Sequence, residues 1–207
     1  MHPFADSPLC PYLCIMKDIS IEHVRKTLSS GDASRKEVSL EGFHRAGVLV
    51  PLVTKNGGIE LLLTKRTENV ETHKGQISFP GGMVDASDAD IVRTALREME
   101  EELGIPQSSV EVMGLLDDLP TPTRFVVTPV IGVLKSLPVL TPNVLEVDDV
   151  FFVPLAFFAD PTVGRKEYRR FRGENHEVWY YHHGDRVIWG VTALIIRSLL
   201  KKLGLLL

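Results

Sequence analysis

The sequence predicts an α/β fold in which a mixed β-sheet is flanked by helices. Two observations carry this prediction. Strand-like runs come first, a strongly periodic helix lies in the middle, and more strands and a terminal helix follow, an order typical of sheets covered by helices on both faces. The chain has 207 residues, of which 44% are hydrophobic and 24% charged, the size and composition of one globular domain.

The first sixteen residues are expected to lie outside that domain. Residues 1–16 are rich in proline, and we predict a poorly ordered extension there, followed by a single domain over residues 17–207. No Lys or Arg precedes Met16, so the segment is not a typical signal peptide. Cys10 and Cys14 are too few for a disulfide framework, which favours free thiols and a cytoplasmic protein. A start of translation at Met16 is an alternative hypothesis, because a predicted helix follows it directly.

Hydrophobic periodicity gives the elements of the first half of the chain. A short amphipathic helix begins after Ser20, a residue type that caps helix N-termini. Two strands flank Asn56-Gly57-Gly58, a strong hairpin signal, and a third short strand follows. The most regular helix pattern of the chain stops at Gly104, the residue type that commonly ends helices. The predicted ranges are a helix to residue 29, strands at 46–54, 59–66 and 76–80, and a helix at 91–103.

Strands dominate the second half. Two apolar runs are separated by an irregular loop at residues 117–123, and Gly184-Asp185 predicts a second hairpin. The leucine-rich terminal helix is expected to cover the sheet, and a homodimer formed through it is left open. The predicted strands are 110–116, 125–134, 150–153, 177–183 and 186–190, with a helical turn within 154–161 and the terminal helix over 191–206.

Charge and hydropathy exclude two classes of partner. The formal net charge is −4, with 23 basic and 27 acidic residues, which argues against a nucleic-acid binder that relies on overall positive charge. No stretch of about 18 consecutive apolar residues occurs, so no membrane-spanning helix is predicted. The expected partner is therefore a small molecule.

The helix at 91–103 concentrates four glutamates within five positions. At about 100° per residue, Glu98, Glu101 and Glu102 share one arc, Glu100 lies outside it and Arg97 borders it. Three converging carboxylates repel one another unless a cation lies among them, and oxygen ligands suit Mg²⁺ or Mn²⁺. Spacing alone leaves a solvated acidic face as an equal alternative.

Gly81-Gly82, just upstream, allows the backbone to approach a ligand closely. Together with the acidic helix it resembles the signature of the Nudix family, G-x5-E-x7-R-E-U-x-E-E-x-G-U, in which U is a bulky aliphatic residue. The second half is matched in full by Arg97-Glu98-Met99-x-Glu101-Glu102-x-Gly104-Ile105. The first half departs from it: counted from Gly82, Asp88 stands in place of Glu, and the interval to Arg97 is one residue too long.

A second element resembles the coenzyme A diphosphatase branch of that family. Thr67 stands where the element has Ser or Ala, and Glu71 stands where it has a second Arg. An arginine at that position would pair with a phosphate of the substrate, whereas a carboxylate would repel the phosphate. The resemblance spans about residues 43–195 and rests on Leu62-Leu63-Thr64-x-Arg66, Gly75-x-x-x-Phe79-Pro80-Gly81-Gly82, Leu155 after Val153-Pro154, and Ile188-Trp189-Gly190-x-Thr192-Ala193.

The resemblance implies an α/β/α sandwich and hydrolysis of a nucleoside diphosphate derivative with Mg²⁺ or Mn²⁺. Arg97 would orient the acidic side chains. The attacking water would be activated by one of these carboxylates, for which Glu101 is the candidate, or by Glu146 from a later loop. For Glu146, a solvated loop residue is the alternative. The implied metal ligands are Glu98, Glu101, Glu102 and the Gly82 carbonyl, and the candidate substrate contacts are Arg66, Lys74, Gly81 and Gly82.

Coenzyme A or its derivatives are the first substrates that the resemblance suggests, with 3′,5′-ADP and phosphopantetheine as products. ADP-ribose, a dinucleotide or an oxidised nucleotide are the alternatives, because Glu71 replaces the expected arginine. A nucleotide sensor without catalysis is a third hypothesis. The intact acidic arc argues against it, because a sensor does not need to retain metal ligands.

Overall fold

The computed structural model describes residues 19–29, 35–68, 74–171 and 173–206. The predicted extension at 1–16, with its cysteines and Met16, lies outside the described residues, as does Glu71. Within these ranges no helix is long and apolar enough to cross a membrane.

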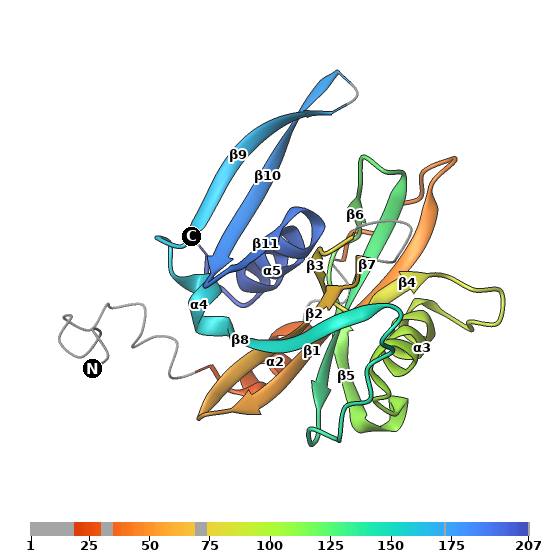
Figure 1. The fold of residues 1–207 in the computed structure, drawn as a ribbon, viewed down its shortest axis with the longest axis vertical. Helices are drawn as coiled ribbons and strands as arrows, with labels where there is room; N and C mark the ends of the chain where they lie inside the picture. The colour runs from red at the N-terminus through yellow and green to blue at the C-terminus, as the bar shows by residue number, and fades with distance from the viewer. Residues whose placement is uncertain (1–18, 30–34, 69–73, 172, 207) are drawn as a thin grey trace.

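The described residues form one eight-stranded mixed sheet and a separate three-stranded sheet (Figure 1). In the larger sheet β1 and β7 run parallel at the centre, and β2 and β5 lie antiparallel on either side of them. Four shorter or peripheral strands pair with β1, β2 and β7. The strands of this sheet are β1 (His44–Lys55), β2 (Gly58–Arg66), β3 (Ile77–Ser78), β4 (Gly81–Met83), β5 (Val110–Leu115), β6 (Leu119–Pro120), β7 (Phe125–Leu134) and β8 (Val147–Pro154).

A two-residue turn joins β1 to β2, as the sequence predicts. Lys55 pairs with Gly58 across the turn, and Asn56 and Gly57 both have positive φ, at 52° and 77°. This is the backbone that twisted hairpins require, and Asn-Gly adopts it with little strain.

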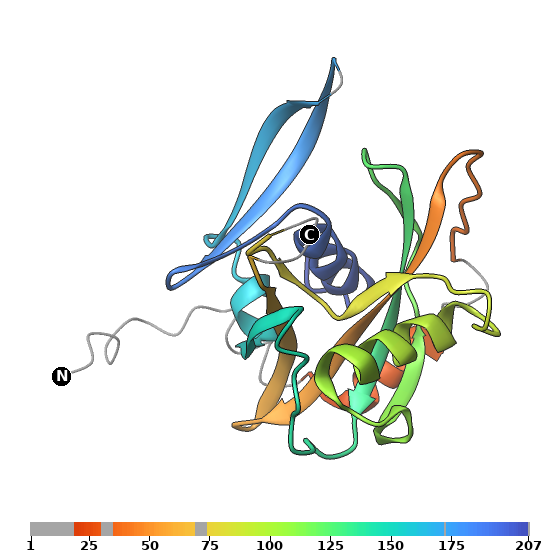
Figure 2. The same ribbon diagram turned by 45° about the vertical axis from the view of Figure 1, so that its right-hand side comes forward.

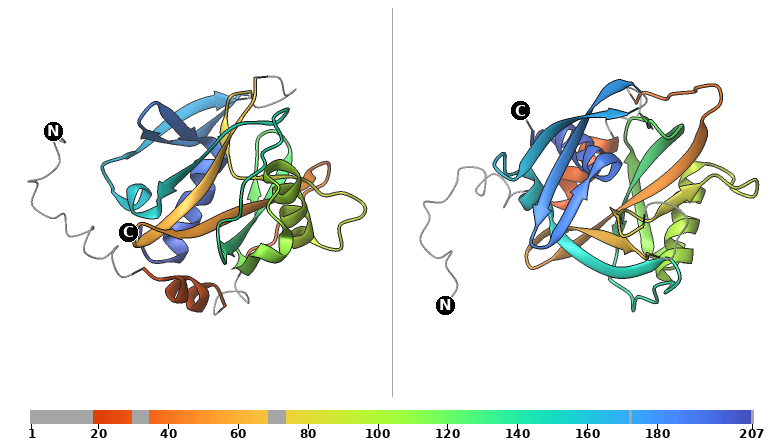
Figure 3. Two further views of the ribbon diagram at one scale, coloured as in Figure 1. Left: turned by 60° about the horizontal axis from the view of Figure 1, so that its bottom comes forward. Right: turned by 45° about the horizontal axis from the view of Figure 1, so that its top comes forward.

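Helices cover both faces of the larger sheet, which confirms the predicted fold class. Along β1, Leu49 and Val53 face the cluster under α3 (Ile91–Leu103), whereas Val50 and Leu52 face the opposite cluster, as a strand's two-residue period requires. That second cluster lies under α2 (Ile21–Ser29), α4 (Leu155–Ala159) and α5 (Gly190–Lys202). Figures 2 and 3 show these helices from further directions.

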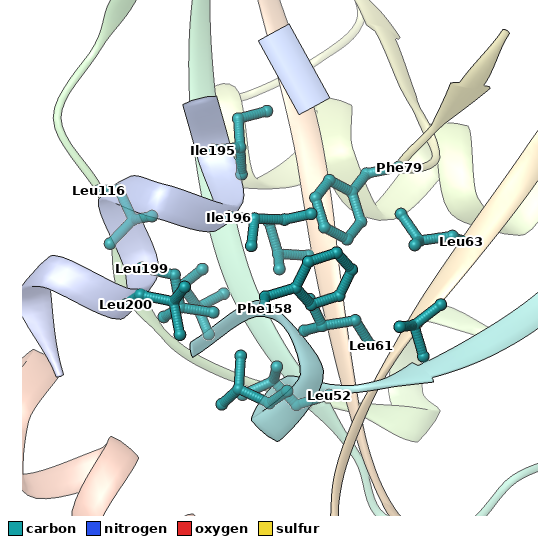
Figure 4. Close-up of a cluster of buried hydrophobic side chains, with 14 of the residues drawn as sticks. Leu52, Leu61, Leu63, Phe79, Leu116, Phe158, Ile195, Ile196, Leu199 and Leu200 are labelled. Atoms are coloured by element: carbon teal, nitrogen blue, oxygen red, sulfur yellow. The ribbon is translucent and has the colours of Figure 1, made fainter. Parts of the chain in front are cut away.

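The terminal helix packs on the sheet, as expected. Ile196, Leu199 and Leu200 of α5 are fully buried and gather with Phe158 and Leu61 in one apolar cluster (Figure 4). Burying each such side chain contributes roughly 1.5–3 kcal/mol. The apolar face of this helix is therefore used within the chain.

The boundaries of α3 are those that the sequence predicts. Asp90 caps its N-terminus by accepting a hydrogen bond from the Arg93 amide at 2.8 Å. Gly104 ends it in the left-handed conformation, with φ of 67°. The helix also lies unusually close to β1, because a Cβ at Gly47 would fall 2.7 Å from the carbonyl oxygen of Ile91.

The three-stranded sheet was not fully predicted. Its edge strand β9 (Gly164–Phe171) is charged and exposed along nearly its whole length, so it lacks the apolar alternation that marks a half-buried strand. It pairs with β10 (Glu174–His183), which begins three residues earlier than predicted, and β11 (Arg186–Trp189) completes the sheet. The hairpin of β9 and β10 stands out from the rest of the molecule (Figure 1).

Two smaller predictions were wrong. The segment at 117–123 is not wholly irregular, because β6 pairs with β7 there. The terminal helix ends at Lys202 instead of residue 206, since Gly204 takes a φ of 71° that ends helices.

Candidate active site

The acidic face of α3 lies against β4, and β1 holds both elements in place. Gly47 and Val48 of β1 pair with Gly82 and Gly81 of β4. The backbone of α3 also comes close to β1 at Gly47, because the missing side chain leaves room for it. One strand thus sets the position of the glycine pair relative to the acidic helix.

Gly82 meets Glu98 directly. A Cβ built at Gly82 would fall 2.4 Å from the Cδ and Oε1 atoms of Glu98, far inside van der Waals contact. The absence of a side chain at Gly82 therefore makes room for the Glu98 carboxylate, which is a candidate metal ligand.

Arg97 lies at the centre of the acidic cluster. Its Nη1 donates to Glu98 Oε1 at 2.8 Å and to Glu101 Oε2 at 2.9 Å. Its Nη2 donates to the carbonyl oxygen of Met83 at 3.1 Å. The hydrogen bonds that Arg97 donates to Asp88, followed by the one that it donates to Glu98, raise the pKa of Arg97 above its usual range. The arginine therefore holds two carboxylates in fixed orientations.

Asp88 is the opposite anchor of that arginine. Its carboxylate accepts Nε and Nη2 of Arg97, both at 3.0 Å, the hydroxyl of Thr94 at 2.9 Å and the amide of Asp85 at 2.9 Å. Hydrogen bonds from Arg97 and from the Asp85 amide lower the pKa of Asp88 well below its usual range. Asp88, which replaces the Glu of the signature, thus has a defined position. Its side chain is shorter than Glu, and it reaches Arg97 from a loop that is one residue longer than in the signature.

Glu102 is the most enclosed carboxylate of the arc. It is 3% exposed, yet its nearest polar contacts are long: the Gly81 amide at 3.5 Å and Arg66 Nη1 at 3.9 Å. Burial raises the pKa of Glu102 to about 8, and burial likewise raises the pKa of Glu98. A buried carboxylate without close partners is costly, so positive charge beside Glu102 would stabilise the ionised site.

Arg66 supplies part of that positive charge from the end of β2. Its Nη1 lies near Glu102, while its Nε is buried and has no hydrogen-bond partner within the described residues. An unpaired buried donor beside the acidic arc is suited to an anionic ligand. Lys74 is exposed, and no hydrogen bond or ion pair joins it to any other described residue.

Glu146 is brought to the same site by the loop before β8. Its Oε1 accepts a hydrogen bond from Asn143 Nδ2 at 2.9 Å, and its side chain is half-buried. The backbone amide of Asn143 in turn donates a hydrogen bond to the backbone carbonyl oxygen of Glu102 at 2.8 Å. The charge of Glu146 contributes to the raised pKa values of Glu98 and Glu102, so these carboxylates are electrostatic neighbours.

The donor chemistry of the cluster fits a divalent cation. In the described part of the chain no group of three or more Asp, Glu, His or Cys side chains is arranged as a ready metal cage, and Glu98 and Glu101 both bind Arg97 instead. The donors are nevertheless hard carboxylate oxygens, which suit Mg²⁺ or Mn²⁺. Glu102 is the clearest candidate ligand, because its buried carboxylate has no close ion pair or short hydrogen bond among the described residues.

Two residues that hold the site were not found from the sequence. Asn143 binds both Glu102 and Glu146, and Thr67 fixes the loop by donating its amide to the Glu146 carbonyl at 2.9 Å. The sequence marked Thr67 only as a departure from the coenzyme A element, and Asn143 only as an Asn in a loop. Glu100, by contrast, lies outside the arc as predicted and accepts a hydrogen bond from Gln107 at 2.8 Å.

The fold and the site together define a class, a hydrolase acting on a phosphate-containing substrate. A family model described as NUDIX domain matches residues 43–171. The chain therefore belongs to the Nudix hydrolase family, as its motifs indicate. Enzymes of this family generally use divalent metal ions and act on small nucleotide molecules.

Curated relatives match most of the chain. A protein of Citrobacter koseri named "Uncharacterized Nudix hydrolase NudL" is 40% identical over 183 residues, which cover 86% of this chain and 93% of the relative. A protein of the same name from Shigella boydii serotype 4 is 42% identical over 166 residues, 78% of this chain and 84% of the relative.

Among solved structures, the Nudix hydrolase RenU from M. smegmatis is 21% identical, with a TM-score of 0.48, and the match covers 61% of this chain and 81% of that one. At that level the similarity adds nothing to the family assignment, which rests on the sequence matches.

Proposed function

We propose that this Nudix hydrolase cleaves the diphosphate bond of coenzyme A or its derivatives, giving 3′,5′-ADP and phosphopantetheine or its acyl form. The observation that carries the proposal is the position of Arg66. It belongs to the Leu62-Leu63-Thr64-x-Arg66 element, which resembles that of coenzyme A diphosphatases, and it lies 3.9 Å from Glu102. The second element of the resemblance, at residues 75–82, ends at the glycine pair beside the same carboxylate.

The proposed metal ligands are Glu98, Glu101 and Glu102, with the Gly82 carbonyl as a further one. Mg²⁺ or Mn²⁺ bound there would neutralise phosphate oxygens and make water a better nucleophile. Arg97 keeps Glu98 and Glu101 pointing in one direction, which lowers the cost of bringing like charges together. Asp88 in turn fixes Arg97 from the other side.

The remaining candidates act on the substrate and on the attacking water. Arg66 would donate to phosphate oxygens through its unpaired Nε and its Nη groups. Gly81 and Gly82 are candidates to contact the diphosphate through their backbone groups, and Lys74 is a second candidate for a phosphate contact. Glu146 would accept the proton of the attacking water, with Glu101 as the alternative base.

A substrate panel tests the proposal. Purified protein is incubated with coenzyme A, acetyl-coenzyme A, ADP-ribose, a dinucleotide and an oxidised nucleotide, each with Mg²⁺, with Mn²⁺ and with EDTA, and products are identified by mass spectrometry. We expect metal-dependent release of 3′,5′-ADP from coenzyme A compounds at the highest kcat/KM. Preference for a compound without pantetheine would assign another substrate, and cleavage of none would favour a sensor.

A charge-removing variant links that activity to the site. Arg66→Gln is expected to raise KM or lower kcat by about tenfold or more, because it removes a charged hydrogen bond to phosphate. Arg93→Gln is the matched control, since Arg93 lies in the first turn of α3 and its side chain makes no hydrogen bond or ion pair within the described residues.

A cytoplasmic location and a homodimer stay predictions from the sequence.

A further inference from the structure

Two large apolar side chains are exposed beside the site, on the loop that leads into β8. Val144 is 79% and Leu145 is 74% exposed, and they directly precede Glu146. Single exposed aliphatic residues are common, but adjacent ones at the rim of a binding site often contact a ligand. Neither side chain belongs to the two buried clusters of the described residues.

Hydrogen bonds hold this part of the loop firmly against the site. The amide of Asn143 donates to the Glu102 carbonyl oxygen at 2.8 Å. On the other side, Thr67 donates its amide to the Glu146 carbonyl at 2.9 Å and its hydroxyl to the Leu145 carbonyl at 2.9 Å. The two apolar side chains are therefore carried on backbone that is fixed to a proposed metal ligand and to the end of β2.

We propose that Val144 and Leu145 form a subsite for the acyl chain at the end of the pantetheine arm and favour acylated over free coenzyme A. The inference rests on the proposed function. In such a substrate the arm leaves the diphosphate on the side opposite the nucleoside, carries no charge and ends, when acylated, in an aliphatic chain. A pair of exposed aliphatic side chains on the loop whose backbone is bound to Thr67, the residue after Arg66, matches that chemistry, whereas it offers nothing to a ribose or a phosphate.

The test compares acyl chain lengths in the wild type and in the double variant V144S/L145S. We measure kcat/KM for free, acetyl-, butanoyl-, hexanoyl- and octanoyl-coenzyme A, and Kd for the same compounds by calorimetry in EDTA, where no turnover occurs. In the wild type each added methylene that packs on the subsite should improve both quantities by about two- to fourfold. The double variant should lose this dependence and keep the wild-type kcat/KM for free coenzyme A.

Val139→Ser is the matched control, because Val139 lies on the same loop, is 87% exposed and precedes the residues that bind the site. It should retain the wild-type dependence on chain length. A wild type that cleaves coenzyme A without any such dependence, or a double variant that keeps it, overturns the subsite alone. A wild type that cleaves no coenzyme A compound overturns the proposed function and the subsite with it. Loss of a dimer in the double variant, measured by light scattering, would instead assign the two residues to contact between copies of the chain.

Discussion

The carboxylate of Asp88 and the guanidinium of Arg97 form a two-pronged ion pair, with Nε–Oδ1 and Nη2–Oδ2 distances of 3.0 Å each. The third nitrogen of the guanidinium, Nη1, is left to bind Glu98 and Glu101. Because one planar group makes all four contacts, Asp88 determines how the two glutamates are oriented.

Asp88→Asn should therefore lower kcat by about 10–100-fold, the range typical of residues that orient metal ligands, with little change in KM. Asparagine keeps the size of the side chain but accepts only one of the two hydrogen bonds. Steady-state kinetics with Mn²⁺ measures the effect. Asp90→Asn is the control, since Asn also caps helices and residue 90 does not touch Arg97. A wild-type kcat in Asp88→Asn would show that Arg97 needs no second anchor.

Glu102→Gln should fold normally and lose well over 100-fold in kcat, because it removes a proposed metal ligand and not merely a residue that positions one. Thermal melts establish folding, and product release measures activity. Glu100→Gln is the matched control on the same helix, because Glu100 contacts Gln107 at the surface, and its activity should stay near the wild type. Activity of Glu102→Gln within a few-fold of the wild type would remove this residue from the metal site.

Two Gly→Ala variants should separate catalysis from stability. At Gly82 an added methyl group meets the end of the Glu98 side chain, which can move aside by giving up its hydrogen bond with Arg97, so Gly82→Ala should lose activity with a smaller loss of Tm than Gly47→Ala. At Gly47 the methyl group meets the helix backbone at Ile91, which cannot move alone. Gly47→Ala should therefore lower the free energy of unfolding by about 1–3 kcal/mol. Equal losses of Tm in both variants would contradict this distinction.

The raised pKa of Glu102 predicts a pH dependence of stability in the metal-free protein. The folded state keeps this carboxyl protonated up to about pH 8, whereas the unfolded chain releases the proton near 4.5. Between these values the native state binds more protons than the unfolded state, so the free energy of unfolding should fall as pH rises. Melting curves in EDTA from about pH 5 to about pH 8 measure it, with the effect much reduced in Glu102→Gln. The same change of Tm with pH in the wild type and in Glu102→Gln would show that Glu102 is ionised in the metal-free fold.

The sequence by itself determined the features that depend on neighbouring residues. The limits of α3, the Asn56-Gly57 turn and the common arc of Glu98, Glu101 and Glu102 all follow from local periodicity and capping. The same local pattern carried the family resemblance, and the match over residues 43–171 confirms it.

Only the tertiary structure decided how distant segments meet at the site. That Gly82 touches Glu98, that Arg66 approaches Glu102, and that Asn143 ties Glu102 to Glu146 depend on strand register and on the path of a long loop. The edge strand β9 escaped prediction because pairing with β10, rather than burial, makes it a strand. Hydrogen bonds between remote backbone segments leave no periodic trace in the residues that make them, and so they must be observed in the fold.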